Sequence, residues 1–109
     1  MIISPPNSFP ATIAAGGSWL SGYIAYNDLN AVSASAKSTQ AGALTLQRYL
    51  DSAGNIPIGT AFTATLTAGS LATVSANGDV AAAFFQITIT NTGGSVATIT
   101  DTVIVLQHT

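Results

Sequence analysis

Residues 41–55 read AGALTLQRYLDSAGN, and this stretch decides the fold class. Leu44, Leu46 and Leu50 fall in one phase of a two-residue period, while Thr45 and its alternate neighbours fill the other. Such alternation is typical of a half-buried β-strand, and the closing DSAGN is rich in turn-forming residues. The stretch therefore predicts a central β-strand that ends in a loop.

Arg48 is the only arginine of the chain and lies in the leucine phase, where an unpaired charge is costly to bury. In one interpretation its stem packs on the leucines while its guanidinium reaches solvent. In a second, it pairs with Asp51, Asp79 or Asp101 and fixes the strand register. In a third, the inward charge discourages edge-to-edge aggregation or anchors a subunit contact.

Composition points to a single all-β domain with an unusually uncharged surface. The 109 residues contain no glutamate and no cysteine, and 6% are charged where ordinary soluble domains carry about 25%. With two basic residues and a net charge of -2, nucleic-acid binding is not expected. No apolar run reaches the roughly 20 residues of a membrane-spanning helix. An N-terminal signal is not expected either, because Pro5-Pro6 breaks the apolar start.

Periodicity and turn signals divide the chain into an extended N-terminal arm, residues 1–10, and a single β-sandwich domain, residues 11–109. Three of the four prolines lie in the arm, where they prevent regular strand pairing. About eight short strands are expected, which favours an antiparallel β-sandwich or jelly-roll. A bend is expected near Asp101 and a tight hairpin at Asn77-Gly78. The expected strands cover residues 11–15, 19–26, 31–37, 41–50, 60–67, 70–76, 80–90 and 95–107.

Catalytic, cofactor and metal sites are not expected. The only histidine, His108, is one residue from the C-terminus, so a hydrolase triad lacks a well-held base. Each aspartate lies in or beside a turn or bend, where this residue commonly hydrogen-bonds its own backbone. No loop gathers the oxygen ligands that calcium needs. The protein is therefore predicted to act by binding and not as an enzyme.

A set of apolar and charged residues is predicted to form an interface. The arm carries apolar side chains that need cover, so it is expected to cross onto a neighbouring subunit. The other aromatic members either fill the core or form an exposed patch. The predicted interface residues are Ile2, Ile3, Phe9, Trp19, Tyr23, Arg48 and Phe84.

Residues 41–55, with FFQITITNTGGSVATI at residues 84–99, resemble the small β-sandwich accessory proteins of tailed bacteriophage virions. This resemblance implies a structural virion protein of the capsid decoration or cement type, or a tail-associated one, assembled in the host cytoplasm. Its partners would be capsid or tail subunits. The NTGG turn also resembles immunoglobulin-like modules of bacterial surface proteins. The alternative function is therefore an immunoglobulin-like or carbohydrate-binding module of a surface or tail protein, with Trp19 and Tyr23 holding the glycan.

Self-association is also expected. The low charge, the run Val103–Leu106 that is apolar in both phases, and the adjacent Phe84 and Phe85 leave apolar groups outside the core. Exposed apolar patches usually mark association sites. The chain is thus predicted to be a homo-oligomer, and the virion resemblance favours a trimer.

Overall fold

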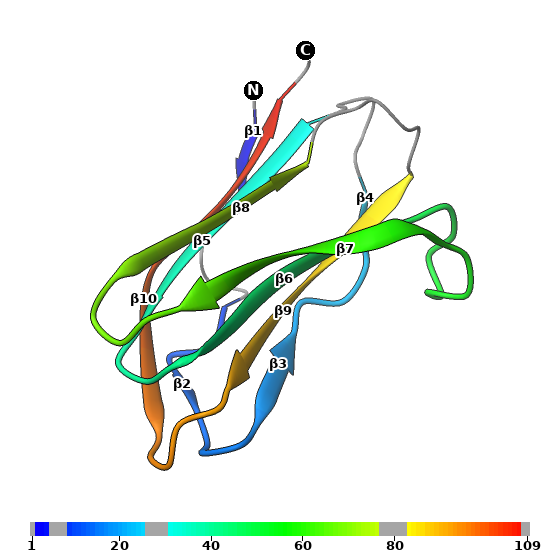
Figure 1. Ribbon diagram of the computed structural model, residues 1–109. Helices are drawn as coiled ribbons and strands as arrows, with labels where there is room; N and C mark the ends of the chain where they lie inside the picture. The colour runs from blue at the N-terminus through cyan, green and yellow to red at the C-terminus, as the bar shows by residue number, and fades with distance from the viewer. Residues whose placement is uncertain (1, 5–8, 26–30, 77–82, 108–109) are drawn as a thin grey trace.

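The computed structural model describes residues 2–4, 9–25, 31–76 and 83–107, which form a sandwich of two antiparallel sheets (Figure 1). No helix occurs in these ranges. The predicted all-β sandwich is confirmed. Its strands are β1 (Ile2–Ser4), β2 (Thr12–Ile13), β3 (Ser18–Leu20), β4 (Ile24–Ala25), β5 (Ala31–Ser38), β6 (Gly42–Tyr49), β7 (Pro57–Leu66), β8 (Leu71–Ala76), β9 (Phe84–Asn91) and β10 (Ala97–Gln107).

Each sheet contains five strands. In sheet 1 the order is β1-β10-β5-β8, and β2 also pairs with β10. In sheet 2 the order is β3-β9-β6-β7, and β4 also pairs with β9. The leucine strand β6 lies between β9 and β7, so it is central as predicted.

Two local predictions are wrong. The strand expected over 19–26 is divided into β3 and β4. At the break, the Ser21 N–H donates to the Ile87 carbonyl oxygen at 2.9 Å, and the Ser21 hydroxyl oxygen accepts from the Ile87 N–H at 2.9 Å, in place of a backbone carbonyl. The strands on either side of Asn77-Gly78 do not form a hairpin: β8 pairs with β5 in sheet 1, and β9 belongs to sheet 2. The Asn-Gly turn itself lies outside the described residues.

The N-terminal segment differs from the expected arm because part of it belongs to the domain's own sheet. Residues Ile2–Ser4 form β1, which pairs antiparallel with β10 and places Ile2 opposite Leu106. Phe9 packs against the core, and its ring lies 4.9 Å from that of Trp19. These contacts tie the arm to the sandwich.

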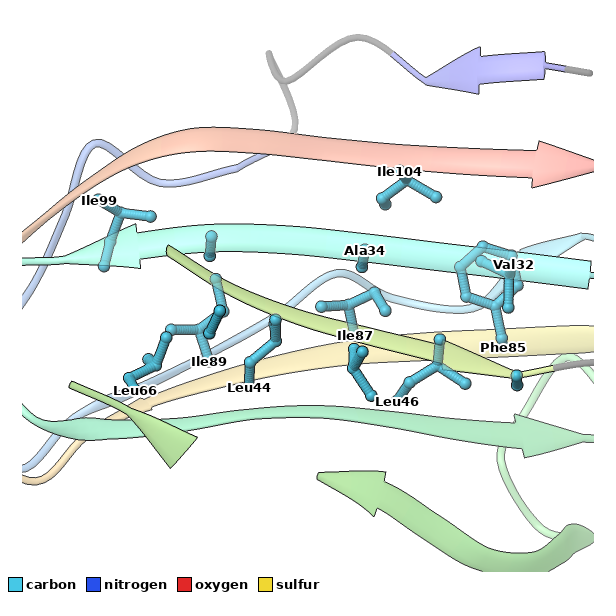
Figure 2. Close-up of a cluster of buried hydrophobic side chains, with 14 of the residues drawn as sticks. Val32, Ala34, Leu44, Leu46, Leu66, Phe85, Ile87, Ile89, Ile99 and Ile104 are labelled. Carbon is cyan, nitrogen blue, oxygen red and sulfur yellow. The ribbon is translucent and has the colours of Figure 1, made fainter. Parts of the chain in front are cut away.

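The core lies between the sheets, and both sheets contribute large apolar side chains to it (Figure 2). Leu44, Leu46, Phe85, Ile87 and Ile89 of sheet 2 are fully buried. Sheet 1 contributes Val32, Ile99 and Ile104 to the same layer, together with four alanines, and close packing of this kind leaves few voids. These buried alanines are Ala34, Ala36, Ala72 and Ala76.

The predicted bend near Asp101 is confirmed as a bulge in β10. Between Thr100 and Val103 the register against β5 shifts by one residue. Asp101 has a φ of 54°, a left-handed conformation that aspartate tolerates better than most residues. The Ser35 hydroxyl donates to the Asp101 carbonyl oxygen at 2.9 Å, which satisfies a backbone group that the bulge removes from the ladder.

Asn91, the last residue of β9, links the two sheets at the end of the sandwich where β9 turns into β10. Its side chain is buried, and its amide nitrogen donates to the carbonyl oxygens of Ile13, Ala14 and Ser95 at 3.0, 3.2 and 2.8 Å. Its amide oxygen accepts from the Gly93 N–H at 2.9 Å. One side chain thereby joins β9 of sheet 2 to the end of β2 and to the connection into β10.

We expect Asn91→Asp to lower the free energy of unfolding by at least about 3 kcal/mol, because it keeps the shape but turns a carboxylate toward buried carbonyl oxygens. Urea unfolding followed by tryptophan fluorescence measures the change. As a control, Thr92→Ala deletes an exposed hydroxyl donor to the Ala41 carbonyl and should cost less than about 1 kcal/mol. Equal stability of Asn91→Asp and the wild type would contradict the role of Asn91.

Candidate functional site

The candidate site is a pair of tyrosines in contact, one exposed and one half-buried, at one end of sheet 2. Tyr23 lies between β3 and β4 and is 39% exposed, while Tyr49 is the last residue of β6. Their ring centroids are 5.2 Å apart and the rings are nearly perpendicular, at 89°. Edge-to-face contact of this kind holds both rings in fixed orientations. We call Tyr23, Tyr49 and the neighbouring β6–β7 loop, residues 50–56, the tyrosine ledge.

Asp51 fixes the shape of this loop, seen in green at the right of Figure 1. Its carboxylate accepts the backbone N–H groups of Asn55 and Ile56 at 3.0 and 2.9 Å. The Leu50 N–H donates to the Ile56 carbonyl oxygen at 3.0 Å and closes the base of the loop. Leu50 and Ile56 are each about half exposed, so the loop offers apolar side chains beside the tyrosines.

Gly54 brings the loop backbone against Tyr23. It has a φ of 76°, and an added Cβ would overlap the Tyr23 hydroxyl. The close approach therefore requires glycine both for its backbone conformation and for its lack of a side chain. It also places the tip of the loop beside the aromatic pair.

The ledge presents neutral rings next to an ionised carboxylate. Burial, followed by the charges of Tyr23 and Asp51, raises the pKa of Tyr49. For Asp51, desolvation acts to raise the pKa, but hydrogen bonds from the Asn55, Ile56 and Ala53 N–H groups outweigh it and lower the pKa below 3.8. At neutral pH the Tyr49 hydroxyl is therefore protonated and Asp51 is negative.

Arg48 lies beneath β7 and not in solvent. It is 6% exposed, so the solvent-reaching interpretation is wrong. Its guanidinium carbon lies 5.0 Å from the centre of the Phe62 ring, a cation–π contact. Here β7 advances four residues, from Phe62 to Ile58, while β6 advances two, from Leu46 to Arg48. The strand thus bulges over the guanidinium.

Gln47 satisfies the carbonyl groups exposed by this bulge. Its amide nitrogen donates to the carbonyl oxygens of Arg48, Ile58 and Gly59 at 3.0, 3.1 and 3.4 Å. Gly59 has a φ of 65°, as glycine often does in a bulge. Gln47 and Arg48 thereby support the strand ends that carry the ledge.

The structure separates the residues predicted to form one interface. Phe9 and Trp19 are half-buried against the core, and Ile2 and Ile3 lie in edge strand β1. Tyr23 is exposed on the ledge. Phe84 is half-buried directly opposite Tyr49 in the β6–β9 register, at the ledge end of sheet 2.

Sequence reasoning missed Tyr49, Leu50 and Ile56 as site residues. One sequence feature pointed to Tyr49: it lies in the phase opposite to the buried leucines, just before the turn of residues 51–55. Its significance depends on Tyr23, which is distant in the sequence. Of the proposed partners of Arg48, Asp51 accepts loop N–H groups, Asp101 lies at an exposed bulge of sheet 1, and Asp79 lies outside the described residues.

Within the described ranges, no group of three or more histidine, cysteine, aspartate or glutamate side chains is placed to hold a metal ion. The same part of the chain includes no helix of the length and apolarity needed to cross a membrane.

Comparison with known proteins shows the fold and no family. No model of a protein family matches the chain, and no curated protein matches it. Among solved structures, PirA is similar over 88% of this chain and 89% of its own, with 13% identity and a TM-score of 0.56. A family 6 carbohydrate-binding module studied for its binding sub-sites is similar over 99% and 94%, with 14% identity and a TM-score of 0.50. The module CsCBM6-3 from Clostridium stercorarium, solved with cellobiose, is similar over 89% of this chain and 71% of its own, with 19% identity and a TM-score of 0.44. At this coarse level, the chain is a small all-β sandwich of the kind found in carbohydrate-binding modules.

Proposed function

We propose that the protein is a non-catalytic binding module that holds a neutral carbohydrate on the tyrosine ledge. The observation that carries this proposal is the exposed Tyr23 ring, fixed edge-to-face on Tyr49 beside a loop closed by Asp51. The apolar faces of sugar rings pack on aromatic side chains, and polar groups nearby set the orientation. The sequence left two hypotheses, a virion protein and a carbohydrate-binding module. The fold likeness to a carbohydrate-binding module supports the second.

The geometry favours binding because the side chains and the loop of the ledge are already ordered before a ligand arrives. Tyrosine has few rotatable bonds, and each ring of the ledge is already held by its neighbour. The loop is likewise fixed by the Asp51 hydrogen bonds and by Gly54 against Tyr23. A preorganised site loses less conformational entropy when a ligand binds.

We expect the wild-type protein to bind a member of a panel of neutral oligosaccharides, and Tyr23→Ala to weaken that binding about 30-fold, as truncation of a central aromatic anchor does. Isothermal titration calorimetry measures the affinity. Leu71→Ala removes an exposed apolar side chain from sheet 1 and should leave binding unchanged. No binding across the panel, or equal binding by Tyr23→Ala, would contradict the proposal.

We expect binding to be constant from about pH 5 to 8 and to weaken as the pH falls below 3.8. The pKa of Asp51 is lower in the folded protein than its ordinary value, so its contribution to loop order is complete above that value and is lost on protonation. Amide chemical shifts of Asn55 and Ile56 should follow the same titration. Asp51→Asn should remove this pH dependence, and its persistence in that variant would assign it to another group.

A second candidate function is assembly with other protein subunits, in the virion role that the sequence resemblance implies. The favouring observation is that Leu20, Leu71 and Val96 are each more than half exposed on a chain with 6% charged residues. Such a surface has little electrostatic protection against association. The partners would be capsid or tail subunits, or further copies of this chain in a trimer.

For this candidate we expect light scattering during size-exclusion chromatography at micromolar concentration to give the mass of three chains. Leu20→Ser combined with Leu71→Ser should return the protein to a single-chain mass, because both replacements remove exposed apolar surface. Detection of the chain in purified virions by mass spectrometry would identify the particle. A wild-type mass of one chain, with no co-sedimentation with particles, would contradict the assembly role.

A further inference from the structure

The outer face of sheet 2 carries a cluster of hydroxyl groups, interrupted by Ala43 and the exposed Leu20, that the tyrosine ledge does not use. Along β6 the buried Leu44 and Leu46 alternate with Thr45, which therefore points away from the core. Residues directly opposite in paired strands share a face, and Thr45 is opposite both Thr88 and Thr63. We call the resulting hydroxyl-bearing surface the threonine face; it comprises Ser18, Thr45, Thr63, Thr65, Thr88 and Thr90.

Neighbouring strands place these hydroxyl groups within reach of one another. Ser18 Oγ lies 3.1 Å from Thr90 Oγ1, and Thr45 Oγ1 lies 3.4 Å from Thr63 Oγ1. Each hydroxyl can donate one hydrogen bond and accept two, so contact with one neighbour leaves capacity for a ligand. Because the side chains stand on paired strands, their spacing is fixed at about 4.8 Å across the sheet and about 7 Å along it.

The threonine face is continuous with the tyrosine ledge. Following β6 backwards from Tyr49, the outward positions are Gln47, Thr45 and Ala43. The antiparallel neighbour β9 presents Phe84 opposite Tyr49 and Thr88 opposite Thr45. From Tyr49 to Ala43 this surface spans about 20 Å at the ordinary rise of a strand. Figure 1 shows sheet 1 on one side of β9, β6 and β7, and Thr45 alternates with core residues that face sheet 1, so sheet 1 does not cover the threonine face.

The face is also free of charged side chains among the described residues. The guanidinium of Arg48 lies under β7, on the inward side of β6. Sheet 1 differs, because its outer side carries Lys37 opposite Thr100 and Asp101 at the β10 bulge. The loop of the ledge itself carries the carboxylate of Asp51, which repels anionic ligands. The surface therefore suits a ligand rich in hydroxyl groups and without charge.

Building on the proposed function, we propose that the ligand is a neutral polysaccharide chain that starts on the tyrosine ledge and continues along β6 and β9 over the threonine face. The rings of Tyr23 and Tyr49 hold one sugar unit, and the hydroxyl rows hydrogen-bond the following units. Affinity then grows with chain length until the roughly 20 Å of the face is occupied. Uronate polymers bind more weakly, because the described residues of this surface offer them no cation.

The test compares glucose and xylose oligomers of two, four and six units, titrated by calorimetry into the wild type and two double variants. In the series that binds, we expect the six-unit oligomer to bind at least about tenfold more tightly than the two-unit oligomer. Thr45→Val combined with Thr88→Val keeps side-chain shape and strand propensity but removes two hydroxyls. This variant should bind the six-unit oligomer only as tightly as the two-unit one.

The matched control is Thr73→Val combined with Thr100→Val, which removes two exposed threonine hydroxyls from sheet 1 and should change nothing. A six-unit uronate oligomer should bind at least about tenfold more weakly than its neutral counterpart. Equal affinities for two and six units, or a threonine-face variant that matches the wild type, would overturn the chain model and leave the ledge as the site. Absence of any binding that depends on Tyr23 would instead overturn the proposed function, and the chain model with it.

Discussion

The buried amide of Asn91 is the interaction on which the arrangement of the two sheets depends. Consecutive strands β8 and β9, and again β9 and β10, lie in different sheets, so local hairpins do not align one sheet with the other. Asn91 supplies that alignment by bonding the end of β2 and the β9–β10 connection from the last residue of β9. Every donor and acceptor of its amide is used, which is the condition under which a buried polar group specifies a unique structure.

The same end of the molecule fixes the register of β6. Gly42 lies opposite Asn91, and a Cβ there would overlap the carbonyl oxygen of Thr90, so only glycine lets β6 approach β9 this closely. From Gly42 the pairing with β9 runs without a shift to Tyr49. A slip of one residue would turn Leu44 and Leu46 outward and Tyr49 inward. The packing at one end therefore determines which side chains stand on the ledge at the other.

The sequence predicted features that depend on near neighbours in the chain. Alternation identified β5 to β8 closely, and Asp101 marked the β10 bulge. The break between β3 and β4 was missed because the Ser21 hydroxyl bonds Ile87, far along the chain. The turn signal at Asn77-Gly78 could not show which strands pair, since that depends on core packing. Likewise, no local pattern reveals that Tyr23 meets Tyr49, or that β7 covers Arg48. The oligomeric state and a virion partner stay predictions.

Lys37 gives the molecule a single lysine for site-selective chemical coupling. It is the only lysine in the chain, and it stands in β5 on the outer side of sheet 1, away from the tyrosine ledge and the threonine face. Apart from the α-amino group, it is the only amine that an acylating reagent can modify. A surface coupled selectively through this side chain would hold the protein in one orientation, with the outer side of sheet 2 turned toward solution. The scarcity of charge thus confines side-chain amine coupling to one place on the molecule.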